Sequence, residues 1–194
     1  MDDGYRRDLS HLTWREVFER QRGRRAYHRR WFDAVGTAAG DTVVEVGSGP
    51  GYVTVELARR VGPAGVVYPV ERNPEGLRFL ERVVHEAAVE NVRPVLADAE
   101  ALPLAFERPA TAYLTYVLHH AEHPARVLSA VRTALAPGSR LFVCEFHPDG
   151  PGDEGPPLDH RLHPDRLRVW LEAAGFGIDA TYGYENESYA FLAT

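Results

Sequence analysis

Apolar runs and helical patterns alternate along most of this chain. From Asp41 onward, short runs rich in β-branched residues are separated by segments with apolar residues at helical spacing. Such runs are typical of parallel strands that are buried on both faces. They predict strands over residues 42–46, 66–70, 92–96, 112–117 and 140–146. Helices with a proline near their start are predicted between them, over residues 75–89 and 124–136.

The C-terminal part of the chain carries a different pattern. A predicted helix over residues 164–174 precedes two strand-like runs, 176–184 and 188–193. Only three residues separate the two runs, and a connection that short permits only an antiparallel pair. With the five earlier strands, whose crossovers must be right-handed, this predicts an α/β fold. Its doubly wound, mostly parallel, seven-stranded sheet has an antiparallel last strand.

The segment before Asp41 has apolar residues at helical spacing, with a break at Gly23. We predict two helices there, forming an N-terminal helical cap over residues 1–40, and one domain over residues 41–194. Pro69 interrupts the second predicted strand. Because proline has no N–H to donate, we expect it at a strand end or at a bulge.

A glycine-rich turn after the first predicted strand gives the strongest chemical signal. Gly47, Gly49 and Gly51 alternate with other residues at the start of a helix. Glycines at such a turn let the backbone bend sharply and approach a ligand closely. The spacing differs from the dinucleotide pattern Gly-x-Gly-x-x-Gly, because Tyr52 occupies the place of the third small residue. A P-loop is excluded because the chain contains no lysine.

Two carboxylates follow at the ends of the next predicted strands. Glu71 lies twenty residues past Gly51, where a carboxylate can accept hydrogen bonds from both hydroxyls of a ribose. Asp98 ends the third predicted strand, where an acceptor can bind the exocyclic amine of an adenine. The carboxyl ends of neighbouring parallel strands meet at one edge of the sheet. The three signals together therefore predict a nucleoside-containing cofactor there.

At this point the chain resembles the class I S-adenosylmethionine-dependent methyltransferases. The matching stretches are residues 43–51, 70–71, 97–104, 118–124 and 135–141. Their order and spacing are most similar to the branch of quinone-biosynthesis and other small-molecule enzymes. The resemblance covers about residues 41–194. It implies a Rossmann-like methyltransferase fold, S-adenosylmethionine as cofactor, and methyl transfer to a small molecule with release of S-adenosylhomocysteine.

The resemblance also implies roles for individual residues. Glu45 and the turn over residues 47–51 would face the methionine part of the cofactor. Glu71 would face the ribose, and Asp98 with Ala99 would face the adenine. Tyr116 would lie near the sulfonium and the entrance for the acceptor. The cofactor-binding residues implied in this way are Glu45, Gly47, Ser48, Gly49, Gly51, Glu71, Arg72, Asp98, Ala99 and Tyr116.

Histidines after the fourth and fifth predicted strands are candidates for a general base, because histidine titrates near neutral pH. His119 or His120 is the first candidate, and His147, together with Glu145, is the second. No metal site is predicted, because the side chains of two adjacent residues are expected to point apart. Tyr27 or Trp31 is expected to reach the site from the N-terminal helices.

Composition and charge limit the expected cellular location and binding partners. The 194 residues carry a net charge of −6 and one cysteine, with no apolar run long enough to span a membrane. We therefore expect a cytoplasmic monomer or homodimer without a disulfide. The arginine-rich run over residues 22–30 is interpreted as a solvated helix face, because the otherwise acidic chain disfavours a nucleic acid.

Two other functions remain open. A nicotinamide-dependent reductase uses a related glycine turn, although Tyr52 disfavours it. A cofactor-binding or assembly module without catalytic activity could use the same fold. The loop over residues 148–158, rich in glycine and proline, is a candidate lid because it follows the fifth predicted strand.

Overall fold

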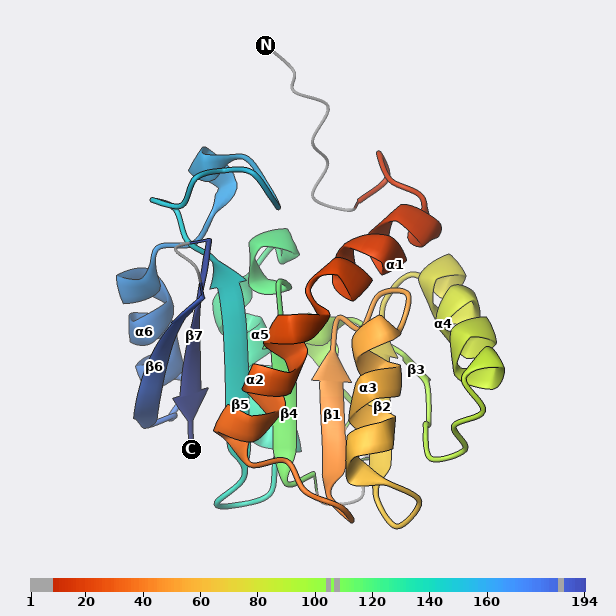
Figure 1. The fold of residues 1–194 in the computed structure, drawn as a ribbon. Coiled ribbons are helices and arrows are strands. Elements are labelled where there is room, and N and C mark those ends of the chain that lie inside the picture. Colours follow the sequence, from red (N-terminus) through yellow and green to blue (C-terminus); the bar gives the residue numbers. More distant parts are fainter. Residues whose placement is uncertain (1–8, 104–105, 107–108, 185–186) are drawn as a thin grey trace.

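The computed structural model describes residues 9–194 except 104–105, 107–108 and 185–186. A seven-stranded sheet is flanked by helices on both faces (Figure 1). The strands are β1 (Thr42–Val46), β2 (Val66–Glu71), β3 (Val95–Leu96), β4 (Thr111–Thr115), β5 (Arg140–Phe146), β6 (Ile178–Tyr184) and β7 (Ser188–Ala193). The α-helices are α1 (Trp14–Gly23), α2 (Arg25–Val35), α3 (Tyr52–Val61), α4 (Pro74–Glu86), α5 (Pro124–Ala134) and α6 (Pro164–Ala173).

The order of strands in the sheet is β3-β2-β1-β4-β5-β7-β6. The pairs from β3 to β5 are parallel, whereas β7 is antiparallel to both β5 and β6. The predicted fold class is therefore confirmed. Strand order reverses between β1 and β4, and in open α/β sheets ligands bind beside that reversal, at the carboxyl ends of the strands. Leu104 and the connection at residues 185–186, which the sequence analysis used, lie outside the described residues.

Several elements end earlier or begin later than predicted, three of them because of the backbone of a single residue. β3 contains only two residues because Pro94 has no N–H to donate, and Val92 makes a single bridge with Val67. β4 stops before Tyr116, whose φ of 60° is incompatible with a strand. α4 stops before Ala88, whose φ of 51° breaks the helix.

Pro69 lies in the middle of β2, so its predicted place at a strand end or bulge is wrong. It pairs in regular parallel register with Glu45 of β1. Val67 and Glu71, two residues before and after it, exchange backbone hydrogen bonds with the segment 91–97. The missing N–H of Pro69 therefore faces β3, where ladder pairing begins only at the next residue of β2. The β1–β2 pairing loses no hydrogen bond.

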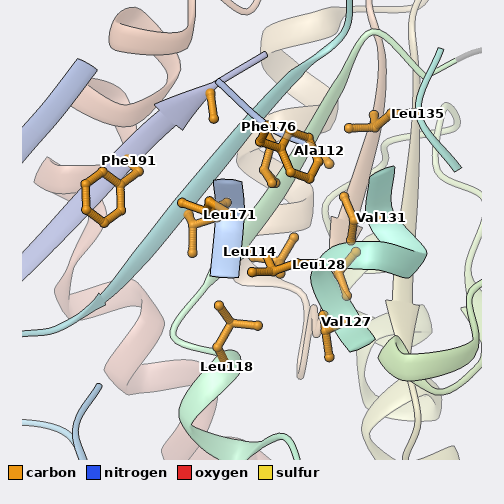
Figure 2. Packing of buried hydrophobic residues seen from close by; sticks show 14 of the residues in the cluster. Ala112, Leu114, Leu118, Val127, Leu128, Val131, Leu135, Leu171, Phe176 and Phe191 are labelled. Carbon is orange, nitrogen blue, oxygen red and sulfur yellow. The ribbon is translucent and has the colours of Figure 1, made fainter. Parts of the chain in front are cut away.

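Two apolar clusters fill the space between the sheet and the helices. Alternate residues of β5 point to opposite faces: Leu141 and Val143 join one cluster, and Phe142 and Cys144 join the other. Helices α5 and α6 cover the first face (Figure 2), and α2 and α3 cover the second. In the described part of the chain no helix is long and apolar enough to cross a membrane.

A buried residue and an exposed residue of α6 provide a matched test of this packing. Leu171 is fully buried, whereas Val169 is 61% exposed. We expect Leu171→Ala to lower the free energy of unfolding by about 2–5 kcal/mol, because it leaves a cavity beneath the sheet. Val169→Ala should change it by less than about 0.5 kcal/mol. Urea denaturation measures both, and equal effects would contradict this assignment of the core.

Candidate cofactor and acceptor site

A cavity of about 1000 Å³ lies at the carboxyl edge of the sheet. The turns after β1, β2, β3, β4 and β5 contribute to its wall, and α1 with the residues before it contributes another part. Figure 1 shows α1 lying above the carboxyl end of β1. Seven predicted cofactor residues line the cavity, namely Gly47, Gly49, Glu71, Arg72, Asp98, Ala99 and Tyr116. The other three, Glu45, Ser48 and Gly51, lie behind its wall.

All three glycines of the turn after β1 have positive φ angles, which glycine adopts without strain. Two of them are also required by the packing of neighbouring side chains. A Cβ on Gly47 would lie 2.6 Å from a methyl carbon of Val117, and one on Gly51 would lie 2.6 Å from Leu80. The close approach inferred from the sequence is thus made at these two glycines to the protein's own side chains.

The end of β2 holds this glycine turn in place. The N–H groups of Gly47 and Ser48 both donate to the carbonyl of Val70. The N–H of Gly49 donates to one carboxylate oxygen of Glu71 at 3.0 Å, and that of Asn73 donates to the other at 2.8 Å. Burial raises the pKa of Glu71, and these two hydrogen bonds oppose the rise. The carboxylate is therefore fixed in orientation in the cavity wall.

Glu45 has a different environment from Glu71. Its side chain is 2% exposed, and its carboxyl accepts a hydrogen bond from the Thr54 hydroxyl of α3 at 2.5 Å. Burial raises the pKa of Glu45 to about 8. The side chain thus packs between β1 and α3, and it is not among the residues that line the cavity.

Gln21 connects α1, which forms part of the cavity wall, to the glycine turn after β1. Its carboxamide nitrogen donates to the carbonyl of Ser48 at 3.2 Å, and its oxygen accepts from the N–H of Tyr52 at 3.0 Å. Nearby, Phe18 packs edge-on against the Tyr52 ring at 5.4 Å. The sequence gives no signal for Gln21, because a single glutamine in a helical pattern belongs to no motif.

The far end of the cavity contains Asp98 and the N-terminal part of α1. One oxygen of Asp98 accepts from the N–H of Glu100 and caps the 3₁₀ helix η1 (Ala99–Ala101). The Trp14 ring packs over Gly76, where a Cβ would come within 2.8 Å of it. Trp14 and Asp98 are both part of the cavity wall.

Aromatic rings form the wall on the side of β4 and β5. Tyr116 stacks on Phe146 with 4.3 Å between ring centroids, and its ring lies edge-on to Trp31 at 5.9 Å. Burial raises the pKa of Tyr116 well above its ordinary value. Its hydroxyl therefore stays protonated and donates to the Ser188 hydroxyl. Trp31 lines the cavity, and Tyr27 does not.

The turn after β4 is organised by Glu145, which is 1% exposed. One of its carboxylate oxygens accepts the N–H groups of Val117 and Leu118 at 3.0 and 2.6 Å. The other lies 2.6 Å from Nδ1 of His119, which lines the cavity. Glu145 thus fixes both the backbone and the histidine ring of this turn.

The other histidines are placed differently from expectation. The rings of His119 and His120 lie 3.9 Å apart, so the prediction that adjacent side chains point apart is wrong here. The 3₁₀ helix η2 (Leu118–His120) places them on the same side of the turn. His147 does not line the cavity, and its Nδ1 accepts the N–H of Asp149. Within the described residues, no three His, Cys, Asp or Glu side chains are grouped to hold a metal ion.

Two members of the arginine-rich run also line the cavity, so the prediction of a solvated face is wrong for Arg24 and His28. The side chain of Arg24 is 12% exposed, and its Nε donates to Glu154 of the loop over residues 148–158 at 2.7 Å. Gly155 and Pro156 bring that loop to the cavity, whereas the neighbouring Arg25 is exposed.

The raised pKa of Glu45 predicts how stability depends on pH. The folded chain keeps this proton up to pH about 8, whereas the unfolded chain releases it near 4.5. The contribution of Glu45 to the free energy of unfolding is therefore fully present below pH 4.5. It decreases as the pH rises to 8, by up to about 1.4 kcal/mol per pH unit.

Glu45→Gln should remove this loss and be more stable than the wild type at pH 8, as measured by urea denaturation between pH 4.5 and 8. Glu81→Gln, on the exposed side of α4, is the control and should follow the wild type. If the wild type and Glu45→Gln respond identically to pH, the proposed environment of Glu45 is wrong.

Comparison with known proteins identifies the family. The family described as "Methyltransferase domain" matches residues 37–167. The ubiquinone/menaquinone biosynthesis C-methyltransferase UbiE of Methylococcus capsulatus is 31% identical over 175 residues, covering 86% of this chain and 65% of that protein. The chain spans about half to two thirds of the length of the curated relatives it matches.

Solved structures show the same architecture. A SAM-dependent methyltransferase from Aquifex aeolicus superposes with a TM-score of 0.80 at 20% identity, covering 86% of this chain and 88% of that one. The [4+2]-cyclase SpnF superposes with a TM-score of 0.71 at 21% identity, covering 81% of this chain and 58% of that one. These likenesses confirm the predicted Rossmann-like methyltransferase fold. Because the family match spans most of the sheet and the glycine turn, the chain belongs to the methyltransferase-domain family, in the class I group that its sequence predicts.

Proposed function

We propose that this protein binds S-adenosylmethionine in the cavity and transfers its methyl group to a small-molecule acceptor. The observation that carries the proposal is the Glu71 carboxylate, which the N–H groups of Gly49 and Asn73 hold in the cavity wall. Beside it lies the glycine turn, and Asp98 lines the same cavity. In a chain of the methyltransferase-domain family, this arrangement fits an adenosyl group better than a pyrophosphate, which needs donors and positive charge.

The residues of the cavity wall fit the ribose, the adenine and the sulfonium of this cofactor. Each oxygen of Glu71 accepts one backbone N–H and has further capacity to accept from a ribose hydroxyl. One oxygen of Asp98 is used by η1, which leaves the other for an adenine amine. Tyr116 lines the same cavity, at the place where the family resemblance puts the sulfonium. The ring of Tyr52, packed between Phe18 and His28, occupies the place where a dinucleotide site needs a small residue.

We assign the general base to His119. Bound S-adenosylmethionine supplies a methyl group on a positively charged sulfur, which keeps the electron pair of the broken bond and becomes neutral. With Nδ1–H donated to Glu145, the Nε2 atom of His119 is left to take the proton that the acceptor loses. Glu145 is a positioning residue, because its other oxygen holds the backbone of the same turn.

The acceptor belongs on the aromatic side of the cavity, between Trp31, Tyr116 and the loop over residues 148–158. Orientation of the acceptor against the methyl group supplies most of the catalysis in this kind of transfer. The net charge of −6 favours a small molecule over a nucleic acid. The buried, unpaired thiol of Cys144 is consistent with a cytoplasmic location.

Cofactor binding is tested with S-adenosylhomocysteine by isothermal titration calorimetry. The wild type should bind it, and should not bind NADH or NADPH. Glu71→Gln should weaken binding about 10- to 100-fold, because the carboxylate loses charge where it accepts hydrogen bonds. Glu81→Gln, exposed on α4, should bind like the wild type. Preference for a nicotinamide cofactor would instead support a reductase.

The base is tested by release of S-adenosylhomocysteine with a panel of phenolic, quinol, amine and carboxylate acceptors. His119→Gln should lower kcat about 10²- to 10⁴-fold while the affinity for S-adenosylhomocysteine stays within about twofold. His147→Gln is the matched control and should retain activity, because it lies outside the cavity wall. Because SpnF shares the fold and is named as a cyclase, binding without methyl transfer to any acceptor would contradict the proposed reaction.

A further inference from the structure

Two polar side chains that line the cavity lie four residues apart: Arg24, which directly precedes α2, and His28 in its first turn. The rings around them are apolar or largely buried: His28 packs against Trp31 at 4.8 Å, and Arg24 lies over Tyr116 and Phe146 at 4.9 and 5.1 Å. Arg24 and His28 therefore place polar groups within a wall that is otherwise formed by aromatic rings. Neither residue is used by the cofactor contacts or by the base proposed above.

His28 has an unused hydrogen-bonding atom. The side chain is 2% exposed, and its Nδ1 has no hydrogen-bond partner among the described residues. A buried polar atom without a partner costs roughly 1–3 kcal/mol, so its retention calls for an explanation. Burial, with the nearby charge of Arg24, lowers the pKa of His28 to about 3. The ring is therefore neutral near pH 7, and Nδ1 can donate or accept one hydrogen bond.

Arg24 has unused donors, and the carboxylate that pairs with its charge is exposed to water. Only its Nε donates to a partner in the described part of the chain, the Glu154 carboxylate. The side chain of Glu154 is 51% exposed, so water screens its charge more than that of Arg24. The two terminal nitrogens of the guanidinium have no hydrogen-bond partner in the described part of the chain, and Arg24 lines the cavity. A guanidinium in this state favours a planar carboxylate or another anionic oxygen.

We propose that Arg24 and His28 form a subsite for an anionic oxygen, a carboxylate or a phenolate, carried by the methyl acceptor. This rests on the proposed function in that the acceptor shares the cavity with the cofactor. The pair belongs to the acceptor because Arg24 contacts the aromatic wall and the loop over residues 148–158. The glycine turn is instead fastened by Gln21, and the acids that fit ribose and adenine follow β2 and β3.

The subsite would determine which acceptors are used. A flat aromatic body would pack against the partly buried Tyr116 ring, which Phe146 and Trp31 support from within the wall. Its anionic group would be paired with Arg24, and His28 would donate a second hydrogen bond without changing its charge. Neutral analogues of the same shape would leave the terminal nitrogens of Arg24 without an anionic partner and bind more weakly.

The test compares benzoate with benzamide, which has the same shape but no charge, by ligand-observed NMR on protein with and without S-adenosylhomocysteine. The wild type should bind benzoate at least tenfold more tightly than benzamide. Arg24→Gln should abolish this preference, and Arg24→Lys should restore part of it. His28→Phe, which keeps the ring packing, should reduce it. Arg22→Gln, on the exposed side of α1, is the control and should retain the full preference.

Glu154→Gln is expected to change the affinity for benzoate in the opposite direction. Removing the carboxylate that competes for Arg24 should tighten benzoate binding severalfold without improving benzamide binding. The proposal is overturned if the wild type does not distinguish the two probes, or if Arg24→Gln and His28→Phe leave the preference unchanged. It is also overturned if these variants weaken the binding of S-adenosylhomocysteine but not the binding of benzoate. That result would assign the pair to the carboxylate of the cofactor itself. Failure of the wild type to bind S-adenosylhomocysteine would overturn the proposed function instead.

Discussion

The site depends on how the end of β2 holds the turn after β1. The carbonyl of Val70 accepts two N–H groups of that turn, and the carboxylate of Glu71 accepts a third. These bonds extend the hydrogen bonding between the parallel strands β1 and β2 into the turn that follows β1. The pairing of β1 with β2 therefore builds the glycine turn and orients the carboxylate at the same time. A wrong register between the two strands would remove both.

A second buried carboxylate has the same role on the other side of the strand reversal. Glu145 at the end of β5 holds the turn after β4, and with it His119. One acid thus supports the part of the cavity that we propose for the ribose, and the other supports the part that we propose for proton transfer. Between them Tyr116 adopts a φ of 60°, which costs energy for a bulky residue and is maintained by these surrounding contacts.

The sequence predicted what depends on local pattern. The bounds of β1, β5 and β7 agree with the predictions, and Glu71 and Asp98 lie in one cavity because parallel strands align their carboxyl ends. The features that were missed depend on contacts between distant parts of the chain. Gln21 reaches a turn 27 residues away, and Arg24 pairs with a residue 130 positions later. No periodicity or spacing encodes such contacts.

Other errors came from general rules that the surroundings overrode. Adjacent side chains point apart in a strand, but a 3₁₀ turn brought the rings of His119 and His120 together. Proline normally ends a strand, but Pro69 is tolerated because its missing donor faces a strand of only two residues. Arginine normally extends into water, but Arg24 lies over two aromatic rings.

A crystal structure of the protein grown with S-adenosylhomocysteine is the most direct test of the central claim. We expect both ribose hydroxyls to donate to the Glu71 carboxylate and the adenine amine to lie within hydrogen-bonding distance of Asp98. Helix α1 should cover the bound compound. Density for the compound outside this cavity, or with its ribose away from Glu71, would show that the proposed cofactor site is wrong.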